Sequence, residues 1–111
     1  RPNIHIEDMT DLYIWMLRRP NLTGIYNAGF ENMTIREIGG LICQNSKAIA
    51  ISEPSNDARS YRLNSDKLLA TGFNPKKTVL DAINELKQKY HAGQLKDEPQ
   101  WHSLAAMPKA A

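Results

Sequence analysis

The sequence predicts a small mixed α/β domain with about four helices and two or three short strands. Apolar residues recur at helical spacing in several segments bounded by capping residues, and short strand-like segments separate them. The length of 111 residues allows one domain with one modest core. The apolar share of 41% and the charged share of 23% are those of a folded globular protein, so a disordered chain is not expected.

The first expected strand is Ile4–Ile6, where apolar and polar residues alternate. Asp8 is the expected N-cap of the following helix, because a side-chain oxygen there accepts hydrogen bonds from the free N–H groups of the first turn. Arg18 and Arg19 favour the C-terminal end of this helix, and Pro20 stops it. The helix is expected to be largely buried through its apolar residues, which are Met9, Leu12, Ile14, Trp15, Met16 and Leu17.

A second strand is expected at Gly24–Gly29, a short segment bounded by glycines. Thr34 and Glu37 have the spacing of a capping box and therefore predict the start of a second helix. Gly39 and Gly40 lie inside this helix and lower its propensity, so close packing against a neighbouring element is expected there. The residues expected to face the core are Ile35, Ile38, Leu41, Ile42 and Cys43.

The middle of the chain alternates between strand-like and polar stretches. A strand is expected at Ala48–Ile51, followed by a polar loop at Ser52–Ala58 and an extended stretch at Tyr61–Leu63. Either Asn64 or Ser65 is expected to cap a short helix.

The last third of the chain contains the clearest helical pattern. Gly72 suits the position that ends the short helix, and the final helix is expected to begin at Thr78 and to end at Gly93. Residues 94–111 form a polar tail outside the domain at residues 1–93, and we expect this tail to pack loosely or to dock on a partner. The apolar stripe of the final helix consists of Val79, Leu80, Ala82, Ile83, Leu86 and Tyr90.

Composition and charge argue against several classes of function. The net charge of +2 is weak and the basic residues are scattered among acidic ones, so no nucleic-acid partner is expected. Cys43 is the single cysteine and cannot form an internal disulfide, which favours a reducing, cytoplasmic compartment. No apolar run approaches the ~20 residues of a membrane span. His5, His91 and His102 lie far apart without a cysteine or carboxylate at metal-ligand spacing, so no metal site is expected.

The motifs of a complete dehydrogenase are missing from this chain. Neither the glycines from Gly24 to Gly29 nor the pair Gly39-Gly40 has the Gly-x-Gly-x-x-Gly spacing that a dinucleotide pyrophosphate requires. No tyrosine is followed four residues later by a lysine, because those positions hold Leu17, Phe30, Ser65 and Gln94. No catalytic or cofactor-binding residue is therefore expected here.

Three residues suited to binding an anion stand at the ends of strands or in loops: Arg1, Asn27 and Arg59. Two guanidinium groups from distant segments suit a nucleotide diphosphate, because each offers paired, charge-assisted hydrogen bonds. The alternative is that Arg59 and Arg62 only form surface ion pairs with Asp57 and Asp66, which contribute little to stability.

Five stretches of the sequence support a diphosphate site, because each matches a motif of one enzyme family and they occur in the same order and at similar spacing. Residues 1–9 match an Arg-Pro-x-Ile-His-Val-x-Asp-Val pattern, residues 24–29 a Tyr-Asn-Val-Gly strand, and residues 34–38 the helix after it. Residues 57–68 match an Asp-x-Arg-x-Tyr segment followed by Asp-x-x-Lys, and residues 72–83 a closing Leu-Gly-Phe-x-Pro and Thr-Val-x-Asp-Gly-Ile pattern. In this order, residues 1–93 resemble the C-terminal part of the NAD-dependent epimerase/dehydratase family, the extended short-chain dehydrogenases that act on nucleotide sugars.

The resemblance implies a role for each of the anion-ready residues. Arg1 and Arg59 would hold the diphosphate of a nucleotide sugar, and Asn27 would assist them. His5 and Asp8 would be structural residues at the corner between the first strand and the first helix. The NAD or NADP of the full-length family would be bound by the preceding part of such an enzyme, so no cofactor is expected in this chain.

Two functions follow from the resemblance. In the first, the chain is a C-terminal fragment of a nucleotide-sugar epimerase or dehydratase that helps to hold the substrate diphosphate and is inactive alone. In the second, it is a stand-alone binding or self-assembly module derived from that family. The chain opens on Arg1-Pro2-Asn3 without an initiator methionine, so a piece of a longer protein is expected. Such a piece should expose apolar surface and form a homo-oligomer or associate with a cofactor-binding domain.

Overall fold

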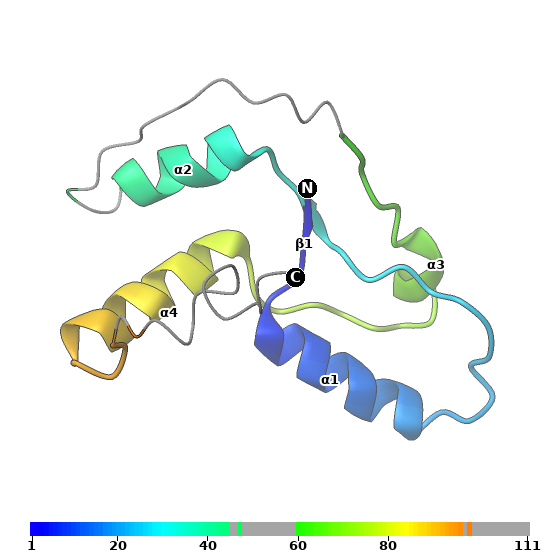
Figure 1. Cartoon of the computed structure of the whole chain (residues 1–111). Helices are drawn as coiled ribbons and strands as arrows, with labels where there is room; N and C mark the ends of the chain where they lie inside the picture. The colour runs from blue at the N-terminus through cyan, green and yellow to red at the C-terminus, as the bar shows by residue number, and fades with distance from the viewer. Residues whose placement is uncertain (45–46, 48–59, 97, 99–111) are drawn as a thin grey trace, which may run out of the picture.

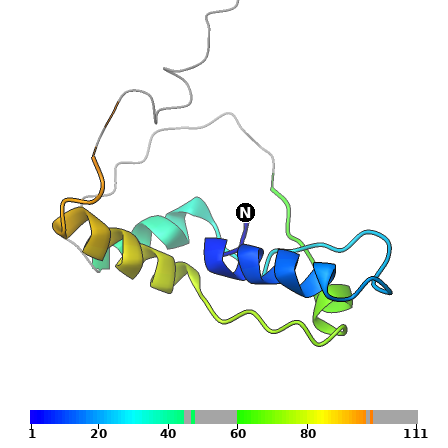
Figure 2. The ribbon, with the colours of Figure 1, turned by 90° about the horizontal axis from the view of Figure 1, so that it is seen from below.

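The computed structural model describes residues 1–44, 47, 60–96 and 98. Within them the chain forms four helices and one two-stranded sheet, which makes the fold mixed α/β as predicted. The elements in chain order are β1 (Pro2–Asn3), α1 (Ile6–Leu17), β2 (Glu31–Asn32), α2 (Ile35–Gln44), α3 (Asp66–Leu69) and α4 (Val79–His91). Figures 1 and 2 show α2 and α4 on one side of the short sheet and α1 and α3 on the other. The expected strand Ala48–Ile51 and loop Ser52–Ala58 lie outside the described residues.

The sheet joins the start of the chain to the segment before α2. β1 and β2 are antiparallel, with Pro2 opposite Asn32 and Asn3 opposite Glu31. The expected strand at Ile4–Ile6 is wrong in its position, because the pairing lies at Pro2–Asn3 and Ile6 is already the first residue of α1.

The helix α1 begins three residues earlier than the sequence suggested. Its N-cap is His5, whose Nδ1 accepts a hydrogen bond from the Glu7 N–H at 3.2 Å. Asp8, the expected N-cap, lies inside the first turn and is 1% exposed. Its carboxylate accepts from the backbone N–H groups of Lys76 and Lys77 at 2.9 and 3.0 Å. The expected capping role of Asp8 is therefore wrong, because its carboxylate accepts hydrogen bonds from the loop before α4 and not from the first turn of its own helix.

The stretch from Gly24 to Gly29 is not the strand that the sequence suggested. Among the described residues, its polar groups bond to residues 64–67, at the start of α3 and just before it, and not to a neighbouring strand. The Ser65 hydroxyl accepts from the Gly29 N–H at 3.1 Å and donates to the Gly29 carbonyl at 3.0 Å. The Asn32 amide group likewise accepts from the Leu63 N–H and donates to the Leu63 carbonyl, at 2.9 and 3.0 Å. Side chains thus take the place of a third strand.

The core lies where α1, α3 and the loop after α3 meet. Leu12, Leu68 and Phe73 are buried, and Leu68 is 0% exposed. The Phe73 ring meets Trp15 edge-on and stacks on Phe30, with both pairs of ring centroids 5.9 Å apart. Gly72 ends α3 at a φ of 90°, a conformation that favours glycine, and so turns the chain back toward α1.

A second packing region joins α2 to α4, which lie side by side in both views (Figures 1 and 2). Neither helix has a buried residue. The expectation that α2 turns a continuous face to a core is wrong at its ends, because Ile35 is 70% exposed and Ile42 is also exposed. Gly39 and Gly40 do not mark close packing either, since a Cβ atom at either position would meet nothing within 4 Å.

The apolar face of α1 is likewise only partly covered. Tyr13, Ile14 and Leu17 are exposed, whereas the sequence suggested a largely buried helix. With the exposed leucines and tyrosine of α4, these residues give the chain the exposed apolar surface that the sequence suggested.

A capping box begins α2, as its sequence indicates, and the structure shows a second one at the start of α4. In the first, the Thr34 N–H donates to the Glu37 carboxylate at 2.6 Å and the Glu37 N–H donates to the Thr34 hydroxyl at 3.1 Å. In the second, Thr78 and Asp81 exchange the equivalent bonds. The backbone hydrogen bond from Thr34 lowers the pKa of Glu37, and the hydroxyl hydrogen bond from Thr78 lowers the pKa of Asp81.

These two carboxylates predict a loss of stability in acid. A carboxyl group whose pKa is lower in the folded state stabilises the fold above its unfolded pKa, and this contribution is lost as the pH falls through the folded pKa. We expect the thermal unfolding midpoint to be level above about pH 5 and to fall below about pH 4.5, where unfolded Glu and Asp begin to bind protons. The double variant Glu37→Gln with Asp81→Asn should show a shallower fall when melts are recorded by circular dichroism. An equal fall in both proteins would contradict the role of these caps.

Candidate functional site

Arg1 stands at the start of β1, beside the segment that follows Arg59 in the chain. The Arg1 backbone nitrogen donates to the Met33 carbonyl at 2.6 Å, which fixes the position of the strand. The Arg1 guanidinium lies over the Tyr61 ring, with its central carbon 5.0 Å from the ring centroid. This contact is a cation–π interaction, and a guanidinium is the side-chain group best suited to bind a phosphate.

Asn27 lies in the exposed stretch between Gly24 and β2. Its Nδ2 donates to the Asn64 carbonyl at 3.1 Å, and one amide hydrogen and the Oδ1 atom have no hydrogen bond among the described residues. Arg1 and Asn27 therefore contact the same segment, at Tyr61 and at Asn64. Three residue steps span at most roughly 11 Å, so the two contact points are close along the chain.

Arg59 lies outside the described residues, so the structure places two of the three sequence-predicted site residues. The described chain resumes at Ser60, one residue before the tyrosine that underlies Arg1.

Lys67 is a candidate that sequence reasoning did not single out. Its Nζ donates to the Ile25 carbonyl at 2.9 Å and lies 4.4 Å from the centroid of the Tyr26 ring. This places an ammonium group beside the stretch that carries Asn27. The contact joins residues 42 positions apart, so no local pattern could have revealed it.

A cluster of His5, Glu7 and Glu85 has the composition of a metal site, with one potential ligand atom from each within 4.8 Å of the others. The hydrogen bonds of His5 favour a structural role. Because Nδ1 accepts from the Glu7 N–H, the hydrogen of the neutral ring belongs on Nε2, which faces Glu85 Oε2 at 3.2 Å. A metal on Nε2 would move that hydrogen to Nδ1 and break the cap of α1.

The two glutamates of this cluster are also paired with lysines. Lys77 contacts Glu7 at 3.1 Å, and Lys89 contacts Glu85, which lowers the pKa of that carboxyl group. The cluster is best described as the corner that joins β1, α1 and α4. His5 and Asp8 both have structural contacts at this corner.

The described residues also line two hollows. An apolar groove of about 820 Å³ runs between α2 and α4, where Ile42, Ile83, Leu86 and Tyr90 line it. A more polar pocket of about 680 Å³ lies beside the C-terminal half of α1, and Trp15 and Phe73 form part of its wall.

Comparison with known proteins adds no relative to this description. No protein-family model, no curated protein and no solved structure matches the chain. Among the described residues, no helix combines the length and the apolar character needed to cross a membrane.

Proposed function

We propose that this chain is the C-terminal part of a nucleotide-sugar epimerase or dehydratase, where it helps to hold the diphosphate of the substrate. The observation that carries the proposal is the position of Arg1 and Asn27. Both contact the segment 61–64, which begins two residues after Arg59. Arg1 and Asn27 are 26 positions apart in the sequence (27 − 1). Both nevertheless contact the segment that comes after Arg59, the third predicted ligand.

The charge of this region supports an anionic ligand. Arg1 contributes a guanidinium, and Lys67 adds an ammonium group beside the Asn27 stretch. Arginine suits a diphosphate because its planar fork donates two parallel hydrogen bonds to phosphate oxygens. The oxidised or reduced nicotinamide cofactor would come from a separate cofactor-binding domain, so the chain alone is proposed to be inactive.

A second candidate function, a self-assembly module, is favoured by the exposed apolar surface. Leu17 is 83% exposed and Tyr90 is 69% exposed, and the groove between α2 and α4 is apolar. Surfaces of this kind mark contacts with another protein domain or with a second copy of the chain. Under the first function the partner is the cofactor-binding domain, and under the second it is another copy.

The proposed function is tested by an NMR titration of the amide shifts at low salt. The ligands are the uridine, guanosine, thymidine and cytidine diphosphates and their sugar conjugates. We expect saturable shifts at the amides around Asn27 and Tyr61, because a diphosphate held there changes the field at both. The shifts should vanish in Arg59→Ala and persist in Arg36→Ala, which removes an exposed arginine of α2 instead.

Each outcome bears on one of the two functions. Loss of binding in Arg59→Ala alone would support the diphosphate site and identify the preferred base. Absence of shifts with every ligand, on a sample with a dispersed spectrum, would overturn binding by this chain alone and favour the assembly module. Equal loss in both arginine variants would show that only the net charge matters.

A further inference from the structure

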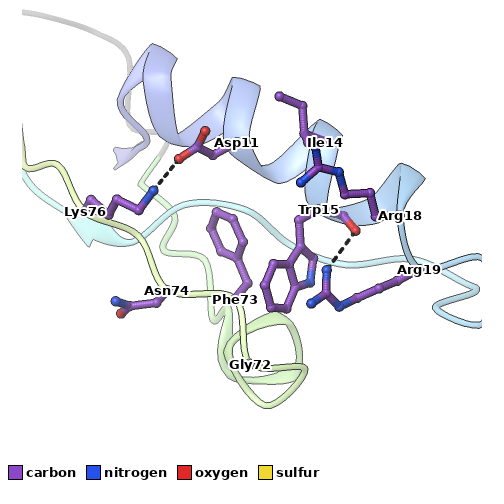
Figure 3. Close-up of a pocket in the computed structure, with 9 residues that line it drawn as sticks. All are labelled: Asp11, Ile14, Trp15, Arg18, Arg19, Gly72, Phe73, Asn74 and Lys76. Atoms are coloured by element: carbon purple, nitrogen blue, oxygen red, sulfur yellow. Dashed lines mark hydrogen bonds and ion pairs between the residues drawn. The ribbon is translucent and has the colours of Figure 1, made fainter.

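The more polar of the two hollows described above lies beside the C-terminal half of α1. Its walls come from two segments: the end of α1 and the residues just after it supply Trp15, Arg18 and Arg19, and the loop after α3 supplies Phe73 (Figure 3). The turn at Gly72 brings that loop against the helix, since a Cβ atom there would lie 3.7 Å from the Trp15 ring. The pocket is thus built by a specific turn and not by the surface of one helix.

The charges around this pocket do not cancel. Three cations, Arg18, Arg19 and Lys76, face one carboxylate, Asp11, which leaves two positive charges (3 − 1). Lys76 Nζ lies 2.7 Å from Asp11 Oδ2, and this hydrogen bond raises the pKa of the lysine, so these two groups balance each other in the count. Within the described part of the chain, no carboxylate lies at ion-pair distance from either arginine. Both uncompensated charges therefore belong to guanidinium groups.

The polar groups near the two arginines are mostly donors. The Arg19 guanidinium lies over the Trp15 indole, 3.2 Å from a ring centroid, and donates to the Trp15 carbonyl at 3.4 Å. A guanidinium has five N–H donors and no acceptor, so most of its donors remain available. The indole Nε1 of Trp15 is buried and has no hydrogen-bond partner among the residues that the structure describes. A buried donor without an acceptor is uncommon and indicates a partner that is still to be supplied.

We propose that this pocket binds an oxyanion, a phosphate or carboxylate group, carried on a small aromatic body. The oxyanion accepts charge-assisted hydrogen bonds from the guanidinium groups of Arg18 and Arg19, which line the pocket beside the Trp15 indole. The aromatic body contacts Ile14 and the edge of Phe73, which form the apolar part of the wall. None of these residues belongs to the proposed diphosphate site, so this second site stands independently of the function proposed above.

The test uses phenyl phosphate as the probe, with inorganic phosphate, benzoate and phenol as matched ligands. The chain has two tryptophans, so a Trp101→Phe background leaves one indole N–H signal, that of Trp15. We expect phenyl phosphate or benzoate to shift this signal saturably, inorganic phosphate to bind more weakly and phenol to leave the signal unmoved. The stronger of the first two probes identifies the oxyanion.

Charge variants locate the binding. The double variant Arg18→Gln with Arg19→Gln should weaken binding about tenfold or more, because charge-assisted hydrogen bonds to both guanidinium groups are lost. Arg36→Gln removes a charge on α2, outside this pocket, and should leave the affinity unchanged. Equal weakening in both variants, or a phenol shift as large as that of phenyl phosphate, would overturn the proposal. So would the absence of any indole shift on a folded sample.

Discussion

Replacing Asp8 by alanine should destabilise the fold by about 3 kcal/mol, because the two backbone N–H groups of the loop before α4 then lose a buried, charged acceptor. The Asp8 carboxylate is 1% exposed, so water does not replace it without opening the corner. For a domain of this size, such a loss is a large part of the total stability. Urea unfolding followed by circular dichroism measures it directly.

Asp11 provides the matched control for this variant. It lies one turn further along α1 and pairs with the Lys76 ammonium in an exposed ion pair, its side chain being 46% exposed. Exposed pairs of this kind contribute between about 0 and 1 kcal/mol. Asp11→Ala should therefore cost less than about 1 kcal/mol, and a similar cost for both alanine variants would show that Asp8 does not hold the loop.

Replacing Gly29 by alanine should cost about 2 kcal/mol, because the added methyl group has no room. A Cβ atom there would lie 2.9 Å from the Pro2 Cβ and 3.2 Å from the Leu63 Cδ1. The proline ring of β1 cannot rotate away, so either the sheet or the Leu63 segment must shift. Such a shift also disturbs the two hydrogen bonds between Gly29 and the Ser65 hydroxyl.

A glycine-to-alanine substitution in α2 should raise the stability of the fold and not lower it. Gly39 lies in the helix interior, and a Cβ atom there would meet nothing within 4 Å. Gly39→Ala should stabilise the fold by roughly 0.5 to 1 kcal/mol through helix propensity alone. The thermal midpoints of the two variants should thus move in opposite directions from that of the unchanged protein. A lower midpoint for Gly39→Ala would indicate packing at this helix face.

Local signals predicted the helices well. Thr34 with Glu37 and Thr78 with Asp81 cap their own helices within three residues, and Gly72 and Gly93 adopt the positive φ that their positions suggested. The errors arose where a side chain serves a distant partner. Asp8 looked like an N-cap because its carboxylate precedes an apolar run, but its acceptors serve residues 68 and 69 positions away. Its neighbour His5 caps the helix instead, an unusual residue for that role.

Of the two candidate sites, the sequence suggested residues of the first but not the second. Arg1 and Asn27 were suggested by residue type and by the resemblance, and the contacts of both with the segment 61–64 agree with a shared location. The pocket of Arg18, Arg19 and Trp15 was not foreseen, because the arginine pair has the pattern of a solvated helix end. What distinguishes it is the approach of Phe73, which lies 58 positions from Trp15 (73 − 15) and depends on the turn at Gly72.

The side-chain hydrogen bonds that join Gly29 and Asn32 to the segment before α3 also affect how the chain folds. Helices of this length can form within about a microsecond, since each bond joins near neighbours. The Asn32–Leu63 and Gly29–Ser65 bonds instead close loops of 31 and 36 residues, and the Asp8–Lys77 bond closes one of 69. The entropy of closing these loops must be met before the bonds form. Folding is therefore governed by the search for these few distant partners, and the chain should fold more slowly than its helical content would suggest.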